Sequence, residues 1–110
     1  MRVIISSPEG IIFDEEVYFV TLTLVDGEIG IYPRRENFIG ALDEGPIKIR
    51  PQNKTLFTPT GLAIKKGDTL HVMIPFVVEA TTYEEYWEIL DQKYNEADNR
   101  IKKLRGIKLE

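Results

Sequence analysis

Residues 16–32 read EVYFVTLTLVDGEIGIY, and this segment determines the fold class of the chain. Apolar residues alternate with polar, β-branched ones over Glu16–Leu24, which is the period of a strand with one buried face. Asp26-Gly27 then supplies a tight turn, and Glu28–Tyr32 returns until Pro33 ends the pairing. The segment therefore predicts a β-hairpin.

Alternation along the first strand of this hairpin also predicts which side chains share a face. We expect Val17 and Phe19 on one face, and Tyr18, Val20, Leu22 and Leu24 on the other. Thr21 and Thr23 continue the first face, so we expect that face to be exposed to solvent toward the C-terminal end of the strand.

Short β-type runs separated by turn signals continue on both sides of the hairpin as far as Ala80, a spacing typical of sandwiches and barrels. The other predicted strands are Arg2–Ser6, Ile11–Phe13, Phe38–Leu42, Pro46–Arg50, Thr55–Pro59, Gly61–Lys65, Thr69–Ile74 and Phe76–Ala80. No segment before Ala80 has a helical period, which excludes alternating strands and helices. Residues 1–80 are predicted to form an antiparallel β-sandwich of about ten strands.

The apolar period changes from 2 to 3.6 after Thr82, so residues 81–110 are predicted to be a C-terminal helical segment. One long helix over Tyr83–Arg105 fits the pattern, with Thr82 and Glu85 at capping-box spacing. Apolar residues at alternating steps of four and three form a seam along it: Tyr83, Trp87, Leu90, Tyr94, Ala97, Ile101 and Leu104. Such a helix either packs back on the sandwich or binds a partner protein through its apolar face.

Composition excludes several classes of function. The 110 residues carry 14 basic and 18 acidic side chains, a net charge of −4, which gives no electrostatic footprint for nucleic acid. There is no cysteine, hence no disulfide, thiolate metal site or cysteine nucleophile. The single histidine, His71, excludes a zinc site built from histidines. We therefore expect no metal and no cofactor.

No segment is long and apolar enough to suggest membrane insertion. The longest apolar run is Met73–Val78, far below the ~20 residues that a bilayer requires. Arg2 is followed by only Val3–Ile5, which is too short for the core of a signal peptide. The sequence is that of a cytosolic-type protein.

The sequence contains no catalytic constellation. His71 falls on the less apolar face of its strand, which indicates a surface histidine. The serines Ser6-Ser7 have no histidine base near them in sequence. Arg34-Arg35 is more distinctive, because two guanidinium groups follow Pro33 in a loop. The doublet serves solubility or contacts a polar or acidic partner, and the residues alone leave both readings open.

The order of these features resembles the epsilon subunit of F-type ATP synthases. Ser7-Pro8-Glu9-Gly10 between two strands is similar to the opening of that family, and Gly27–Pro33 matches its signature Gly-Glu-aliphatic-Gly-aliphatic-Leu/Tyr-Pro. Ala41-Leu42 followed by Gly45–Ile49 is similar to a further strand, as is Gly61–Val72. The resemblance covers residues 1–80, and the helical tail matches only in kind.

The resemblance implies a non-catalytic rotor subunit of the central stalk, which couples ion-driven rotation to ATP synthesis. In that family the sandwich binds the gamma subunit and one end of it meets the membrane-embedded c-ring. The chain would then be peripheral, on the cytoplasmic face of the bacterial inner membrane. The c-ring-facing loop would comprise Glu28, Gly30, Tyr32, Pro33, Arg34 and Arg35.

Three departures qualify this reading. Residues 33–37 read Pro-Arg-Arg-Glu-Asn where the family usually has Pro-Gly-His-Ala-Pro. Residues 90–95 lack the arginine and alanine of the family's regulatory ATP motif, so we expect no ATP site. The helical tail is shorter than the family's two-helix hairpin, which weakens any inhibition of ATP hydrolysis.

The tail still carries basic residues that could meet acidic groups on the alpha/beta catalytic head: Arg100, Lys102, Lys103 and Arg105. The alternative from another class is a free-standing β-sandwich that binds a small ligand or a peptide. That alternative predicts a stable monomer with a pocket lined by aromatic residues.

Overall fold

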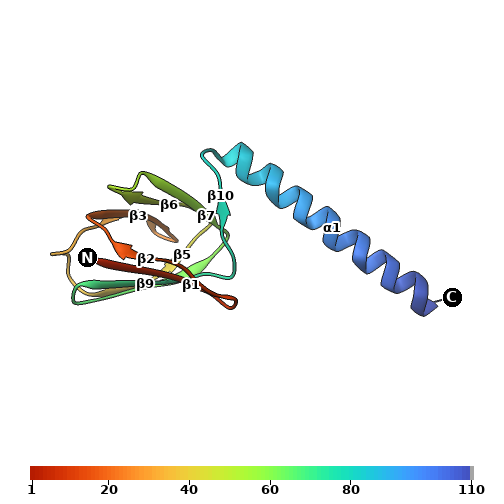
Figure 1. Ribbon diagram of the computed structural model, residues 1–110, viewed down its shortest axis with the longest axis horizontal. Coiled ribbons are helices and arrows are strands. Elements are labelled where there is room, and N and C mark those ends of the chain that lie inside the picture. Colours follow the sequence, from red (N-terminus) through yellow and green to blue (C-terminus); the bar gives the residue numbers. More distant parts are fainter. Residues whose placement is uncertain (110) are drawn as a thin grey trace. The chain divides into compact units, whose positions relative to one another are not determined.

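A computed structural model describes the backbone of residues 1–109 and the side chains of residues 1–96. The chain divides into two compact units, Met1–Ala80 and Thr81–Glu110. The described part of the first unit contains ten strands, and that of the second contains one helix (Figure 1). The predicted fold class, a ten-stranded β-sandwich followed by a helical tail, is therefore confirmed.

Each predicted strand is present, with ends that differ by a few residues. The strands are β1 (Arg2–Ser7), β2 (Gly10–Glu16), β3 (Phe19–Leu24), β4 (Gly27–Ile31), β5 (Phe38–Leu42), β6 (Gly45–Arg50), β7 (Lys54–Thr58), β8 (Gly61–Lys66), β9 (Thr69–Met73) and β10 (Val78–Glu79).

The strands form one curled sheet that folds over its own core. Their order is β10-β7-β6-β3-β5-β8-β9-β1-β2, with β4 paired beside β3. In Figure 1, β3 and β6 lie in the upper layer of the sandwich, and β1 and β9 lie in the lower one. The pairing of β1 with β9 is parallel, with Val3 opposite Leu70. Turn signals report only on strands adjacent in sequence, so they did not predict this pair.

Side chains that alternate inward from both layers make the core. On β9, for example, Leu70 and Val72 are fully buried while His71 and Met73 are exposed. The core cluster consists of Met1, Val3, Ile5, Phe13, Val17, Val20, Leu22, Ile31, Leu42, Ile47, Ile49, Leu56, Ala63, Leu70, Val72 and Ile74. This core fixes the register of the strands, because a one-residue slip would turn every inward side chain outward.

The predicted strand Glu16–Leu24 is shorter in the structure, because Glu16 ends β2, Val17 and Tyr18 lie in no strand and β3 begins at Phe19. The predicted facing of its first residues is wrong. The amide of Val17 donates to the carbonyl of Met1 at 2.8 Å, whereas the next amide, Tyr18, donates to Arg50 at 3.0 Å. The chain changes layers here, so simple alternation is lost. Val17 joins the core and Tyr18 is 75% exposed, while Val20 is buried as expected.

The helix α1 spans Tyr83–Leu109 and so continues beyond the predicted end at Arg105. It begins with the predicted cap: the Glu85 amide donates to the Thr82 hydroxyl at 3.2 Å. The Glu85 carboxylate in turn accepts the hydroxyl and the amide of Thr81, at 2.9 and 3.2 Å. Over the described residues, no helix is apolar enough for long enough to cross a membrane.

Candidate functional site

The loop that follows β4, residues 32–37, is the most distinctive part of the sandwich surface. The β3–β4 pairing ends at Ile31, and Pro33, two residues later, has no amide with which to continue the ladder. The Arg35 amide donates to the Tyr32 carbonyl at 3.0 Å, which closes a tight turn over Pro33 and Arg34. We refer to residues 32–37 as the arginine loop.

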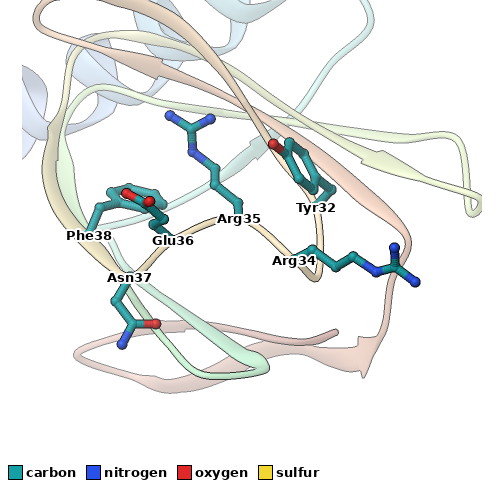
Figure 2. Close-up of a pocket in the computed structure, with 6 residues that line it drawn as sticks. All are labelled: Tyr32, Arg34, Arg35, Glu36, Asn37 and Phe38. Atoms are coloured by element: carbon teal, nitrogen blue, oxygen red, sulfur yellow. The ribbon is translucent and has the colours of Figure 1, made fainter.

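The arginine loop surrounds an open cavity of about 410 Å³. The residues that line the cavity are Tyr32, Arg34, Arg35, Glu36, Asn37 and Phe38 (Figure 2). Arg34 is exposed and Arg35 is half-buried. Figure 2 shows their two side chains extending in different directions from the loop. The cavity is an open surface feature rather than an enclosed ligand pocket.

The two arginines differ in their local contacts. The Arg35 guanidinium lies over the ring of Phe38, 5.9 Å from the ring centroid, in a cation–π arrangement. Neither Arg34 nor Arg35 forms an ion pair with a side chain in the described range. Both charges therefore remain available to an external acidic group.

A buried lysine beneath the loop was not predicted. Lys65, at the end of β8, is only 2% exposed. Its ammonium group donates to the backbone carbonyls of Arg35 at 2.6 Å, Gly67 at 2.7 Å and Pro33 at 3.3 Å. These bonds use all three donors of an ammonium group. The sequence did contain a clue to this burial. Lys65 lies two residues after the buried Ala63 on the same strand, and side chains two residues apart point to the same face of the sheet.

A second hydrogen bond joins the same two segments. The Gly67 amide, in the β8–β9 turn, donates to the Asn37 side-chain oxygen at 2.8 Å. Gly67 has φ of 59°, a left-handed conformation that glycine adopts without steric cost. The arginine loop is thus fastened to this turn at two points.

Two of the predicted loop residues lie on β4 and do not line the cavity. Glu28 is exposed opposite Thr23, next to the β3–β4 turn. Gly30 pairs with Thr21, and the ring of Phe19 lies over it. The structure therefore brings together Tyr32, Pro33, Arg34 and Arg35, and leaves Glu28 and Gly30 farther back along the strand.

A second feature is an apolar area on the outer surface of β5, β8, β9 and β1. Cross-strand partners share a face, and Ile39, Ile64, His71 and Ile4 stand opposite one another in one row. A parallel row contains Ala41, Leu62, Met73 and Ser6. Ile39 is 73% exposed, Met73 40% and Leu62 39%. We call these two rows the apolar face.

Residues of the helical seam differ in exposure. Leu90 is buried, whereas Tyr83, Trp87 and Tyr94 are exposed. Tyr86, which lies off the seam, is fully buried, and its ring centroid is 5.4 Å from that of Trp87. The predicted seam residues Ile101 and Leu104 lie on α1, but their side chains are outside the described residues. The same holds for the predicted basic contacts, Arg100, Lys102, Lys103 and Arg105.

The ion pair between Arg2 and Asp14 at the sandwich surface lowers the pKa of the Asp14 carboxyl. The Arg2 guanidinium donates to both carboxylate oxygens of Asp14, at 2.9 and 2.8 Å. These hydrogen bonds, together with the positive charge of Arg2, lower the pKa of Asp14 below its ordinary value of 3.8. Among the described residues, no three His, Asp or Glu side chains gather into a potential metal site.

Comparison with known proteins gives a family match and two similar folds. The family model for the ATP synthase, Delta/Epsilon chain, beta-sandwich domain matches residues 1–80. A chain from the mitochondrial ATP synthase central stalk and c-ring of Tetrahymena thermophila is 13% identical, with a TM-score of 0.64, over 86% of this chain and 90% of that one. A chain from the OSCP/F1/c-ring structure of the Euglena gracilis mitochondrial ATP synthase is 16% identical, with a TM-score of 0.66. This second match covers 82% of the present chain and 61% of the other.

Proposed function

The chain belongs to the ATP synthase delta/epsilon family, and we propose that it is a non-catalytic rotor subunit of the central stalk. In this role it links the c-ring, which ion flow turns, to the gamma subunit and so to the catalytic head. The observation that carries the proposal is the family match over the whole of the β-sandwich, residues 1–80. The two similar folds come from central-stalk or c-ring assemblies and agree with it.

The apolar face is the surface that we assign to the gamma subunit. Solvent-facing apolar side chains that adjoin one another on a sheet mark a protein interaction site, whereas isolated ones do not. Ile39, Leu62 and Met73 are exposed members of two adjoining rows, and the sheet beneath them holds them in fixed register. A rigid apolar surface of this kind loses little conformational entropy when a partner covers it.

The arginine loop and β4 form the surface that we assign to the c-ring. Arg34 and Arg35 offer two positive charges that no described side chain neutralises, and Tyr32 adds an exposed phenol beside them. Such a surface fits acidic groups on the polar loops of the ring, because complementary charge favours correct encounter and register. Glu28, Gly30 and Pro33 complete the proposed contact.

The helical unit is assigned to the catalytic head. Tyr83, Trp87 and Tyr94 are exposed apolar-bodied side chains, and tyrosine and tryptophan are enriched in protein interfaces. The basic residues of the tail supply charge for acidic groups on the alpha and beta subunits. Since residues 90–95 lack the arginine of the regulatory motif, the proposal includes no bound ATP. The assembled subunit would be peripheral, on the cytoplasmic face of a bacterial inner membrane.

The test is recovery of partners from membranes of the source cell, using the tagged full-length chain. We expect gamma, alpha and beta subunits to co-purify with the wild type, as identified by mass spectrometry. The I39D/L62D variant, which places two charges on the apolar face, should lose gamma. Y18D is the control, because Tyr18 is 75% exposed between β2 and β3 and its amide is bonded to Arg50 on β6, a strand that is not part of that face. Recovery of the wild-type chain alone would refute the proposal.

A further inference from the structure

Lys65 differs from an ordinary surface lysine in both halves of its side chain. Its strand position lies between Phe38 on β5 and Leu70 on β9, so its aliphatic stem starts from a core position. Its ammonium group ends under the arginine loop, where three backbone carbonyls surround it. No described carboxylate pairs with it. A buried charge is tolerated only when it is well hydrogen-bonded, so these carbonyls must stay in place around it.

The carbonyls that bind Lys65 come from two separate segments. Pro33 and Arg35 belong to the arginine loop, and they stand on either side of Arg34. Gly67 belongs to the β8–β9 turn. One ammonium group therefore fixes the backbone on both sides of Arg34 and fastens it to the rigid end of a core strand.

We infer that Lys65 is a positioning residue, which holds the arginine loop in the conformation that presents Arg34 and Arg35 to an acidic partner surface. This inference rests on the proposed function, in which that surface belongs to the c-ring. A loop that is ordered before contact loses less entropy on binding, so Lys65 acts through the two arginines without touching the partner.

The first measurement concerns the free chain. Amide hydrogen exchange by NMR reports on the Arg35 amide, bonded to Tyr32, and on the Gly67 amide, bonded to Asn37. In K65M, which keeps the stem and removes the charge, we expect both amides to exchange at least about tenfold faster. The Val25 and Asp43 amides, bonded to Ala41 and Thr23 at the end of β5 opposite the one that the loop enters, are internal controls and should not change. Unchanged exchange at Arg35 and Gly67 would overturn the inference.

A chemical rescue separates the charge from the packing. The chain has no cysteine, so K65C introduces a unique thiol, which can be alkylated in the unfolded chain before refolding. Aminoethylation restores an ammonium group at nearly the length of lysine, and propylation gives a neutral group of similar length. The aminoethylated protein should recover slow exchange at Arg35 and Gly67, and the propylated one should not. Equal recovery by both would contradict a role for the charge.

The second measurement uses the assembled ATP synthase in vesicles and follows ions pumped per ATP hydrolysed. K65M should lower this ratio at least about twofold in the wild-type background and have no further effect in R34A/R35A, because Lys65 acts through those arginines. An equal loss in both backgrounds would refute the positioning role. If R34A/R35A alone leaves pumping intact, the arginine loop is not the coupling surface and the inference fails with it. Partner recovery, as described above, then shows separately whether the subunit assignment survives.

Discussion

The ring of Phe19 lies so close over Gly30 that a Cβ at position 30 would stand 2.7 Å from the Cζ atom of the ring. Phe19 is on β3 and Gly30 on β4, where it faces Thr21. Glycine at this position of the Gly-Glu-Ile-Gly-Ile-Tyr-Pro segment therefore has a steric reason. The ring covers the backbone of the strand that leads into the arginine loop.

The first prediction concerns this contact. G30A should destabilise the sandwich by about 1–3 kcal/mol, because the added methyl group displaces the ring. Urea unfolding of G30A, F19A and the double variant measures the coupling. In F19A/G30A the second substitution should cost much less than in the wild type, because the clash is gone. Additive losses would show that the ring does not exclude a side chain at position 30.

The second prediction concerns the charges of the arginine loop. R34E/R35E should reduce ATP-driven ion pumping by the reconstituted enzyme, because it places negative charge against the acidic surface that we propose. The control is K48E/R50E, which changes the net charge by the same amount on two exposed residues of β6. This control should pump as the wild type does. Equal pumping by both double variants would exclude the loop from coupling.

The third prediction concerns the start of α1. T82A removes the hydroxyl that accepts the Glu85 amide and should cost about 1 kcal/mol of helix stability. Thermal loss of the helical circular dichroism signal measures this change, and it should begin at lower temperature in T82A. T82S keeps an oxygen at the cap and should behave like the wild type. A T82S curve that matches T82A would show that the methyl group, not the cap, is responsible.

The fourth prediction concerns the Arg2–Asp14 pair. Because folding lowers the pKa of Asp14, the pair stabilises the native state above the ordinary carboxyl pKa of 3.8. That contribution is lost as the pH falls through the lower pKa of the folded protein. D14N should therefore be less stable than the wild type near neutral pH, and the difference should shrink in acid.

Urea unfolding of the wild type, D14N and R2M across this pH range tests the assignment. R2M should lose the same pH-dependent part of the stability, since it removes the other partner of the pair. A D14N deficit that persists unchanged in acid would show that the carboxylate charge is not responsible.

The sequence predicted local structure well, because local patterns encode it. The β3–β4 hairpin follows from Asp26-Gly27 between alternating strands, and the cap follows from the spacing of Thr82 and Glu85. The crossing at Val17–Tyr18 could not be predicted, because it depends on the carbonyls of Met1 and Arg50, which lie far away in sequence. The residues around Val17 and Tyr18 do not indicate which distant strand each of these two amides will bond to.

The candidate site was predicted only in outline. Arg34 and Arg35 in a loop after Pro33 were visible in the sequence, and the structure leaves both without an ion pair among the described residues. The burial of Lys65 was not predicted, because charged residues at strand ends usually face solvent. The position of Lys65 on the same strand face as the buried Ala63 was a clue to its burial. Its three carbonyl acceptors could not be predicted, because they belong to segments that only folding brings together.

The parallel pairing of β1 with β9 has a consequence for biosynthesis. A ribosome delivers β1 and β2 early, and these two strands can form a hairpin at once. The other edge of β1 has no partner until β9, Thr69–Met73, has left the exit tunnel. Until then Val3 and Ile5, which are fully buried in the folded sandwich, lack their neighbours Leu70 and Val72 on β9. A nascent chain that stalls before Met73 therefore carries an open strand edge, a target for chaperones or for aggregation.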